Sequence, residues 1–445
     1  MKKHLLIVII MGFCYSQATG FSIYGAGEKI QNTDPSVIAL GNNSFFSGNS
    51  KNISNESPSS LWRSTLTRFS IYSGINYMKN KQFPGQYQHN LTSFSLLFPV
   101  GNKKVFGFGL QPVYRTNKLD IRDKDFQFIG ADESITGKPI ALKNNYSIDG
   151  GISELFLEYS RKLSPHYSGG IKYSFLFGNQ YLENKLYTYN VVIDTTKSGF
   201  LISEIIENDK IFYVQYEDSV VTELNKFRKF SGSTLMIEGR YKGSKHECVM
   251  SASINGRVRV ETQNIQTSDN ITYTNNFINS SNAILSDLGF GYLYKISENE
   301  MLKTFGFGAK DNAGIAMELH KIYPFNIPEN SALFNIMPPE ENSIHFGTYY
   351  QIRNPKIGFW NNLNLRGGAY YKELNYIGEI LIDHGVTLGI GIEYLRNTQS
   401  IDFAFRTGKI ESRVIDQVGS RYEKYISFHI GITTGEKWFM KRRRK

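Results

Sequence analysis

The chain has 445 residues, enough for one large barrel or for two to three soluble domains. Tyrosine (28), phenylalanine (31) and glycine (40) are abundant and proline is scarce (12), which suits β-structure with many turns better than it suits helices. Seven positive charges lie at Lys2, Lys3 and residues 441–445, so the net charge of +10 leaves only +3 for the body and does not indicate nucleic-acid binding.

The beginning of the chain has the pattern of an export signal. Lys2 and Lys3 precede an apolar run at residues 5–13, and the small residue Ala18 ends the segment. The apolar run is too short to cross a membrane. We therefore expect residues 1–18 to be a signal peptide, and the rest of the chain to lie outside the cytoplasm.

Residues 19–66 lack a regular alternation of polar and apolar side chains. The sequence Asn-Thr-Asp-Pro at residues 32–35 predicts a helix start, because it combines a capping side chain with a proline in the first turn. Serine, asparagine and glycine crowd residues 42–60, which is typical of a loop. This segment is either a periplasmic leader or a plug folded inside a barrel.

From residue 67 to residue 435 the chain alternates apolar and polar residues in short runs, as membrane-spanning β-strands do. The mean hydropathy of −0.33 does not exclude such a barrel, because every second side chain faces a polar lumen. The pattern predicts an all-β fold, a transmembrane antiparallel β-barrel of about 14 strands. The predicted strands are residues 67–78, 89–99, 105–115, 152–163, 167–177, 233–242, 246–263, 283–296, 301–310, 344–353, 361–371, 385–395, 400–408 and 425–435.

The connections between these strands alternate between short turns and longer loops. Barrels of outer membranes show this alternation because periplasmic turns are short and external loops are long. We expect loops at residues 116–149, 313–342 and 372–383, among others. The longest connection, residues 179–232, is predicted to be an extracellular insert whose strand-like pieces at 185–193 and 211–217 form a hairpin above the barrel.

The last predicted strand closes the barrel against the first. Four apolar side chains on one of its faces are expected to face lipid: Ile426, Phe428, Ile430 and Ile432. The residues that follow, 436–445, are predicted to be a basic periplasmic tail. In this tail Trp438 and Phe439 fit the aromatic girdle at a membrane interface.

No motif in the sequence indicates catalysis, a cofactor or a metal site. The repeated Gly-x-Gly pairs open no helix, so they are better explained as small residues that face the lumen. His246-Glu247 lacks the second histidine of a zinc protease. Cys248 is the only cysteine beyond the signal, which excludes an internal disulfide. His429 faces the predicted lumen, where we expect it to bond its neighbours rather than act as a base.

Several stretches resemble the FadL-type family of long-chain fatty acid transporters and the related PorV-like barrels. They are FGFGLQP at 106–112, RGGAYY at 366–371 and HGVTLGIGIEY at 384–394, together with the glycine-rich start and the Pro-Ser-Ser-Leu turn before the first strand. The resemblance implies that the N-terminal segment is a hatch in the lumen. Its plug residues would be Gly25, Gly27, Leu40, Gly41, Pro58 and Leu61.

The resemblance also implies a function. The protein would be a passive uptake channel for hydrophobic small molecules, such as long-chain fatty acids or hydrocarbons, in a Gram-negative outer membrane with both termini in the periplasm. Expected partners are outer-membrane lipid, the substrate, and the β-barrel assembly machinery during insertion. The alternative is a PorV-like accessory barrel that binds a secretion or assembly partner through residues 179–232. An aromatic lumen would favour transport, and exposed apolar residues on the insert would favour a partner.

Overall fold

The computed structural model describes most of the chain. The described residues are 27–30, 32–80, 86–101, 103–122, 127–129, 140–194, 203–207, 210–268, 271–281, 284–297, 312–323, 340–353, 362–376, 379–394, 398–412 and 422–436. Five predictions fall outside them: the signal at 1–18, Gly25, the strand at 301–310, the pair Trp438 and Phe439, and the tail after Glu436.

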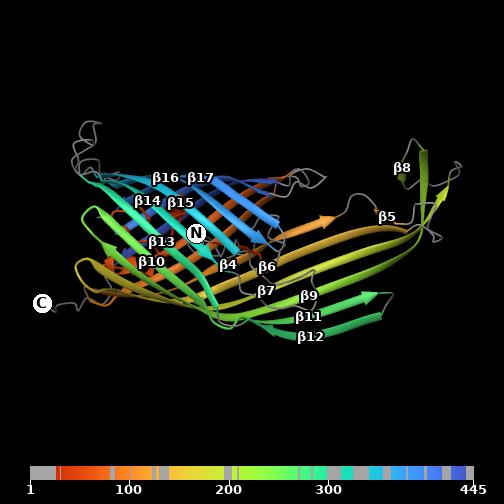
Figure 1. Cartoon of the computed structure of the whole chain (residues 1–445), viewed down its shortest axis with the longest axis horizontal. Coiled ribbons are helices and arrows are strands. Elements are labelled where there is room, and N and C mark those ends of the chain that lie inside the picture. Colours follow the sequence, from red (N-terminus) through yellow and green to blue (C-terminus); the bar gives the residue numbers. More distant parts are fainter. Residues whose placement is uncertain are drawn as a thin grey trace, which may run out of the picture.

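Within the described residues, fourteen antiparallel strands form a closed barrel, which confirms the predicted fold class (Figure 1). They are β2 (Thr67–Asn80), β3 (Gln86–Pro99), β4 (Lys104–Arg122), β6 (Ile140–Lys162), β7 (Tyr167–Asp194), β9 (Lys210–Lys242), β10 (His246–Asn255), β13 (Ile284–Ser297), β14 (Asn312–Ile322), β15 (Glu340–Arg353), β16 (Asn362–Tyr376), β17 (Glu379–Tyr394), β18 (Gln399–Ser412) and β19 (Tyr422–Glu436).

The last strand pairs with the first along its whole length. β19 pairs with β2 from Glu423 opposite Asn80 to Glu436 opposite Thr67. This pairing removes both free edges of the sheet, which a structure surrounded by hydrocarbon requires because no water is present to satisfy backbone groups.

Each strand turns apolar side chains outward and polar or small side chains inward. In β19, Ile426, Phe428 and Ile432 are 45%, 44% and 41% exposed, and Ile430 is half-buried, whereas His429 and its inward neighbours are buried. The same outward rows recur around the barrel, on side chains that include Phe69, Phe106, Leu157, Phe175, Ile237, Met250, Phe290, Met317, Phe346, Leu388 and Phe405. Together they form an apolar belt for lipid. Among the described residues, no helix is both long and apolar enough to span a membrane.

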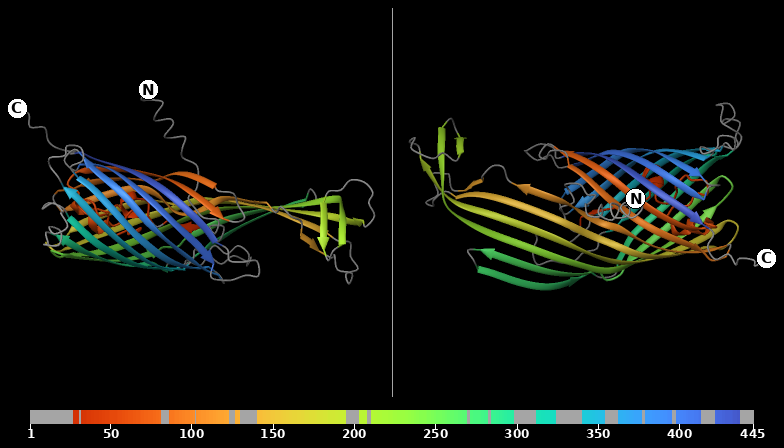
Figure 2. Two further views of the ribbon diagram at one scale, coloured as in Figure 1. Left: turned by 90° about the horizontal axis from the view of Figure 1, so that it is seen from above. Right: turned by 180° about the vertical axis from the view of Figure 1, so that it is seen from behind.

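The barrel has two unlike rims. We call the end where β2 begins and β19 ends the near rim, and the opposite end the far rim. At the far rim β6, β7 and β9 continue far beyond the other strands and form an extended wall (Figure 2). Four further strands belong to this region: β5 (Gln127–Ile129), β8 (Ser203–Glu207), β11 (Arg259–Ser268) and β12 (Ile271–Ser280).

The extended wall changes the expectation for residues 179–232. The strands β7 and β9 pair continuously from Tyr167 opposite Tyr241 up to Asp194 opposite Tyr213, with one register shift after Tyr189. The predicted pieces 185–193 and 211–217 do pair with each other, but as the continuation of the barrel strands β7 and β9 rather than as a separate hairpin. Polar side chains alternate in this upper part as in the lower part, so the pattern contains no signal for a boundary.

The prediction of one long strand at residues 246–263 was wrong. The predicted strand 246–263 ends at Asn255, and the chain bends at Gly256 before Arg259 begins β11, which pairs with the upper part of β9. Val258 and Val260 are buried in a cluster with Phe230 and continue the apolar alternation across this bend. The alternation therefore concealed the bend.

Three predicted loops are largely strand. The segment 313–342 contains most of β14, whose outward residues Ile315, Met317 and Leu319 alternate with inward Glu318 and His320. β16 and β17 reach into 372–383, and β4 and β6 reach into 116–149. Charged residues in these segments suggested loops, but they face the interior or water beyond the membrane, where strands tolerate them.

We predict that Phe428→Lys on the closing strand destabilises the barrel by about 2–4 kcal/mol, because a cation is then forced into hydrocarbon near mid-strand. The free energy of unfolding is measured by urea titration in lipid vesicles. Phe428→Leu, which stays apolar, is the control. Equal stability of the two variants would show that this face does not contact lipid.

Candidate functional site

Residues 33–64, which we call the inner segment, lie inside the barrel. Its short helix α2 (Pro35–Ile38) packs against β17, β18 and β19, and its 3-10 helix η2 (Pro58–Arg63) packs against β4, β6, β7 and β9. A two-residue strand, β1 (Glu28–Lys29), precedes the segment and pairs with β4. The segment thus crosses the lumen from one wall to the other.

The predicted plug residues lie at close contacts between the inner segment and the barrel wall. Leu40 and Leu61 are fully buried and Pro58 is buried. Gly41 has φ +75°, and a Cβ on it would lie 2.1 Å from the carbonyl oxygen of Phe346. Only glycine satisfies both constraints. Gly27, with φ +98°, is equally tight against the backbone of Arg115.

Glycines of the barrel strands leave room for bulky side chains of the inner segment. A Cβ on Gly291 would meet the ring of Phe45, and one on Gly347 would meet Leu40. Phe45, Leu40 and Phe46 belong to one buried cluster with Val249, Leu293, Ala316 and Tyr349 of the wall. This agrees with the expectation that the Gly-x-Gly pairs supply small lumen-facing positions.

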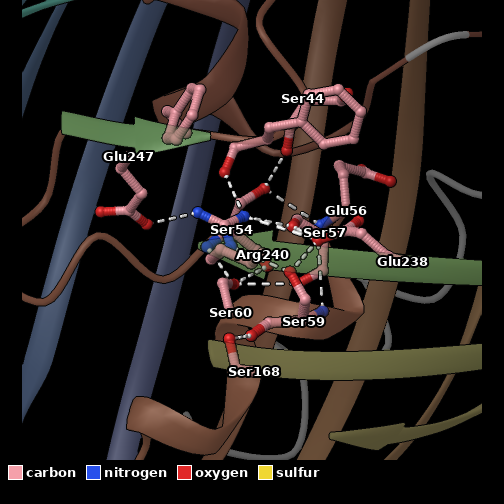
Figure 3. Close-up of polar contacts among 12 residues, drawn as sticks. Ser44, Ser54, Glu56, Ser57, Ser59, Ser60, Ser168, Glu238, Arg240 and Glu247 are labelled. Atoms are coloured by element: carbon pink, nitrogen blue, oxygen red, sulfur yellow. Dashed lines mark hydrogen bonds and ion pairs between the residues drawn. The ribbon is translucent and has the colours of Figure 1, made fainter. Parts of the chain in front are cut away.

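A buried arginine, Arg240 of β9, connects the middle of the inner segment with the start of η2 (Figure 3). Its guanidinium donates to the carbonyl oxygen of Phe45 (2.8 Å), to Ser57 Oγ (2.6 Å) and to Ser59 Oγ (2.8 Å). It also bonds Glu247 Oε1 at 2.7 Å. One side chain of the wall therefore holds both residue 45 and the start of η2.

Two carboxylates complete this network. Glu247 of β10 also bonds Arg63 at 2.5 Å and Lys295 of β13 at 2.8 Å, so three cations surround it. Glu238 of β9 accepts from the hydroxyls of Ser57 and Ser59 and from the Ser59 N–H. Buried charges are stable only when paired in this way, and removing one partner leaves another unsatisfied.

A second network anchors the middle of the inner segment. Glu318 of β14 accepts from Ser44 Oγ (2.5 Å) and from the Phe45 N–H (3.0 Å). His320, on the same face of β14, lies between Glu318 Oε1 (2.6 Å) and Asp287 Oδ1 (3.0 Å). Asp287 in turn pairs with Lys29 at 3.3 Å.

Asp34 caps α2 and lies in the lumen rather than in a membrane-spanning strand. Its Oδ1 accepts from the Ser36 N–H at 2.8 Å and from Ser36 Oγ at 2.7 Å, and its Oδ2 accepts from Tyr72 at 3.0 Å. Burial raises the pKa of Asp34 to about 6, and the nearby negative charges of Asp402 and Glu56 act in the same direction.

Beside the inner segment the lumen retains a cavity of about 150 Å³. Its lining mixes apolar, uncharged polar and titratable side chains, and the titratable ones include Lys29, Glu56, Glu154, Lys172, Asp287, Glu318 and His320. Lys172 and Glu154 pair across it at 2.7 Å, and Tyr114 is the only phenylalanine, tyrosine or tryptophan among the described lining residues. The aromatic lumen that would favour hydrophobic transport is not found among the lining residues.

The sequence analysis missed four residues that hold the inner segment, namely Arg240, Glu238, Glu247 and Glu318. It did predict the helix start at residues 32–35, where Asp34 caps α2. Pairs of charges two residues apart on one strand, as in Glu238 and Arg240, point to the same face and could have revealed them. The expectation for His429 was wrong: it is buried, and neither ring nitrogen has a hydrogen-bond partner among the described residues. No cluster of three or more metal-binding side chains occurs in the described part of the chain.

The fold and the inner segment define a class of protein, a transmembrane barrel of the FadL-type outer-membrane fold. The model of the BamG family matches residues 1–445, so the chain belongs to the BamG family. No curated protein matches the sequence.

Three solved structures share the fold. The Ralstonia pickettii toluene transporter TbuX is 11% identical with a TM-score of 0.52 over 91% of this chain and 99% of that one. The CymD monoaromatic hydrocarbon channel is 10% identical, with a TM-score of 0.51 over 93% of this chain and 100% of that one. The Pseudomonas putida toluene transporter TodX is 13% identical, with a TM-score of 0.50 over 92% of this chain and 99% of that one. At these identities the similarity establishes architecture alone.

We predict that Arg240→Met loosens the inner segment and costs about 3–5 kcal/mol, because it leaves buried carboxylates without their shared cation. Unfolding by urea measures the stability. Labelling of a cysteine at Ser47, in a Cys248→Ser background, measures detachment of the segment. Lys185→Met, which breaks a partly exposed pair on the extended wall, is the control and should change little. Equal effects of the two variants would contradict the anchoring role.

We predict that Asp34 makes the protein less stable as the pH rises from about 4 to about 6. The carboxyl group of Asp34 binds its proton more tightly in the folded protein, where its pKa is about 6, than in the unfolded chain, where its pKa is near 3.8. The stabilisation is therefore complete below the unfolded value and is lost as the pH passes about 6, with a total of up to about 3 kcal/mol. Asp34→Asn keeps the cap but carries no charge, so its unfolding free energy should be flatter over this range. Parallel profiles for both proteins would contradict this assignment.

Proposed function

We propose that this protein is an accessory subunit of an outer-membrane β-barrel assembly complex, and that its extended wall is the surface that contacts the complex. The family name supports this, because it has the prefix used for subunits of the β-barrel assembly machinery. In this proposal the far rim faces the cell exterior, and the termini and the basic tail lie in the periplasm.

The observation that carries the proposal is the height of the wall on one side of the barrel. A tilted strand crosses a bilayer with about 9–11 residues. β19 has 15 residues, whereas β9 has 33. The part of β9 beyond a membrane-crossing length is roughly 70–80 Å long, at about 3.3 Å per residue. A sheet of this size that is not closed into a barrel serves no purpose in a pore but offers a large contact surface.

The outer surface of the wall also carries apolar residues at the level of the far rim. Tyr181 and Phe227 are 44% and 39% exposed, and they lie opposite each other on β7 and β9. Around them, Lys185 pairs with Glu183 and Glu223, which stiffens the surface. An aromatic pair surrounded by paired charges is typical of a protein contact site.

The interior favours a structural role over a channel. The inner segment is held by charged side chains of three barrel strands, namely Arg240 and Glu238 of β9, Glu247 of β10 and Glu318 of β14. The cavity that remains is small, and charged side chains line part of it. A hydrophobic solute that crosses this lumen would have to displace charge-paired groups. We propose that the inner segment is a plug that keeps the barrel closed and rigid.

We predict that the full-length protein, extracted from outer membranes in mild detergent, copurifies with subunits of the β-barrel assembly machinery. Replacement of residues 188–220 by Asn-Gly joins the paired residues Tyr187 and Val221 by a tight turn and removes the part of the wall above them. This deletion should weaken the association, while β11 and β12, which are connected to residues 222–231 of β9, remain in place. The control is an unchanged barrel, seen as unaltered heat-dependent migration on gels. Association at full yield without the upper wall would refute the role of the wall. Purification of the unaltered protein alone would refute the function.

A second candidate function is uptake of hydrophobic molecules. The shared fold with toluene and monoaromatic hydrocarbon channels favours it, together with the segment inside the lumen. Uptake of labelled toluene and of a labelled long-chain fatty acid by a deletion strain tests it. Transport requires that uptake fall in the deletion strain and rise with Arg240→Met, whereas the accessory role requires that both strains match the wild type.

A further inference from the structure

The strand β12 forms the outermost edge of the extended wall. β11 pairs on one side with β9 and on the other with β12, from Arg259 opposite Ser280 to Ser268 opposite Ile271. In the described part of the chain, no strand pairs along the second side of β12 (Figure 1). Figure 2 shows the same strand at the margin of the molecule from the opposite side. The barrel removes its own edges, but the wall retains this one.

The composition of β12 does not protect this edge. Its ten residues read ITYTNNFINS and contain no charge, no proline and no glycine. Natural proteins block exposed edges with lysine, proline, bulges or covering segments, because an open edge recruits other strands. β11 beside it carries Arg259 and Glu261. The lack of protection on β12 therefore indicates that its edge is occupied when the protein works.

The side chains of β12 protrude on both faces. Ile271 and Tyr273 are 55% and 65% exposed on one face, and Ile278 is 59% exposed on the other. Large apolar and β-branched side chains stabilise a neighbouring strand through cross-strand pairs. Alone at an edge they gain nothing, but beside a partner strand they would be covered.

The unpaired side presents a row of alternating N–H and C=O groups. Over ten residues this row is about 34 Å long and offers roughly ten hydrogen bonds. Only an extended polypeptide repeats donors and acceptors at that spacing, which is the basis of recognition by strand addition. The edge thus specifies the conformation of its occupant.

We propose that β12 is a docking edge that accepts an extended segment of a partner protein as an additional strand of the wall. The segment is uncharged, with β-branched or aromatic side chains opposite Ile271, Tyr273 and Ile278. This inference rests on the proposed function, since the partner would be a protein of the assembly complex.

The test uses the full-length protein in its native outer membrane with a photoreactive phenylalanine analogue at Tyr273. We expect an adduct whose crosslinked peptide maps to one extended segment of one partner. The double variant Thr274→Lys with Asn276→Lys adds charges to the free edge and should lower the adduct yield by about tenfold or more, equivalent to ~1.4 kcal/mol of lost pairing. Gln263→Lys with Gln266→Lys, at two exposed positions on opposite faces of β11, is the control and should leave the yield unchanged.

Three results would overturn the inference: an adduct to a second copy of this chain, equal yields from both double variants, or no adduct at all. Unchanged heat-dependent migration shows that each variant is folded.

The outcome separates the inference from the proposed function. Copurification with the assembly machinery without an adduct at Tyr273 refutes only the docking edge. A mapped strand adduct to a protein outside that machinery refutes only the proposed function.

Discussion

The pairing of β19 with β2 is the contact on which the rest of the structure depends. In hydrocarbon an unpaired backbone group has no water to bond, so a sheet is stable there only when its ends meet. Closure then produces an interior that is separated from lipid. The buried charges and glycine contacts that hold the inner segment, and the cavity beside it, lie in the interior that this seam creates.

Because the interior is polar, the protein can hold a segment there with charges rather than with apolar packing alone. Arg240, Glu238 and Glu318 bind backbone and hydroxyl groups of the inner segment that would otherwise be buried without partners. The glycines of the wall allow close approach, and the ionic contacts set the register. The combination favours one fixed position of the segment over a sliding plug.

The extended wall differs from the barrel below it in its edges and in its surroundings. It is not closed, so it again has edges and two exposed faces, and water rather than lipid surrounds it. The continuous pairing of β7 with β9 makes it a rigid extension of the membrane-spanning strands. A protein that needed only a pore would gain nothing from this extension, whereas one that presents a surface to partners would.

The sequence by itself determined the fold class, the outward rows such as Ile426 and Phe428, and small lumen-facing residues such as Gly291, because a strand repeats every two residues whatever its partners are. It did not determine where strands end: the bend at Gly256, the strand β14 and the height of β9 depend on pairing with distant segments. The contacts that anchor the inner segment could not be predicted from the sequence either. Arg240 lies 181 and 183 residues from Ser59 and Ser57 along the chain and contacts them only when the barrel has closed. Local periodicity is a property of the chain, whereas register and contacts across the lumen exist only once the barrel closes.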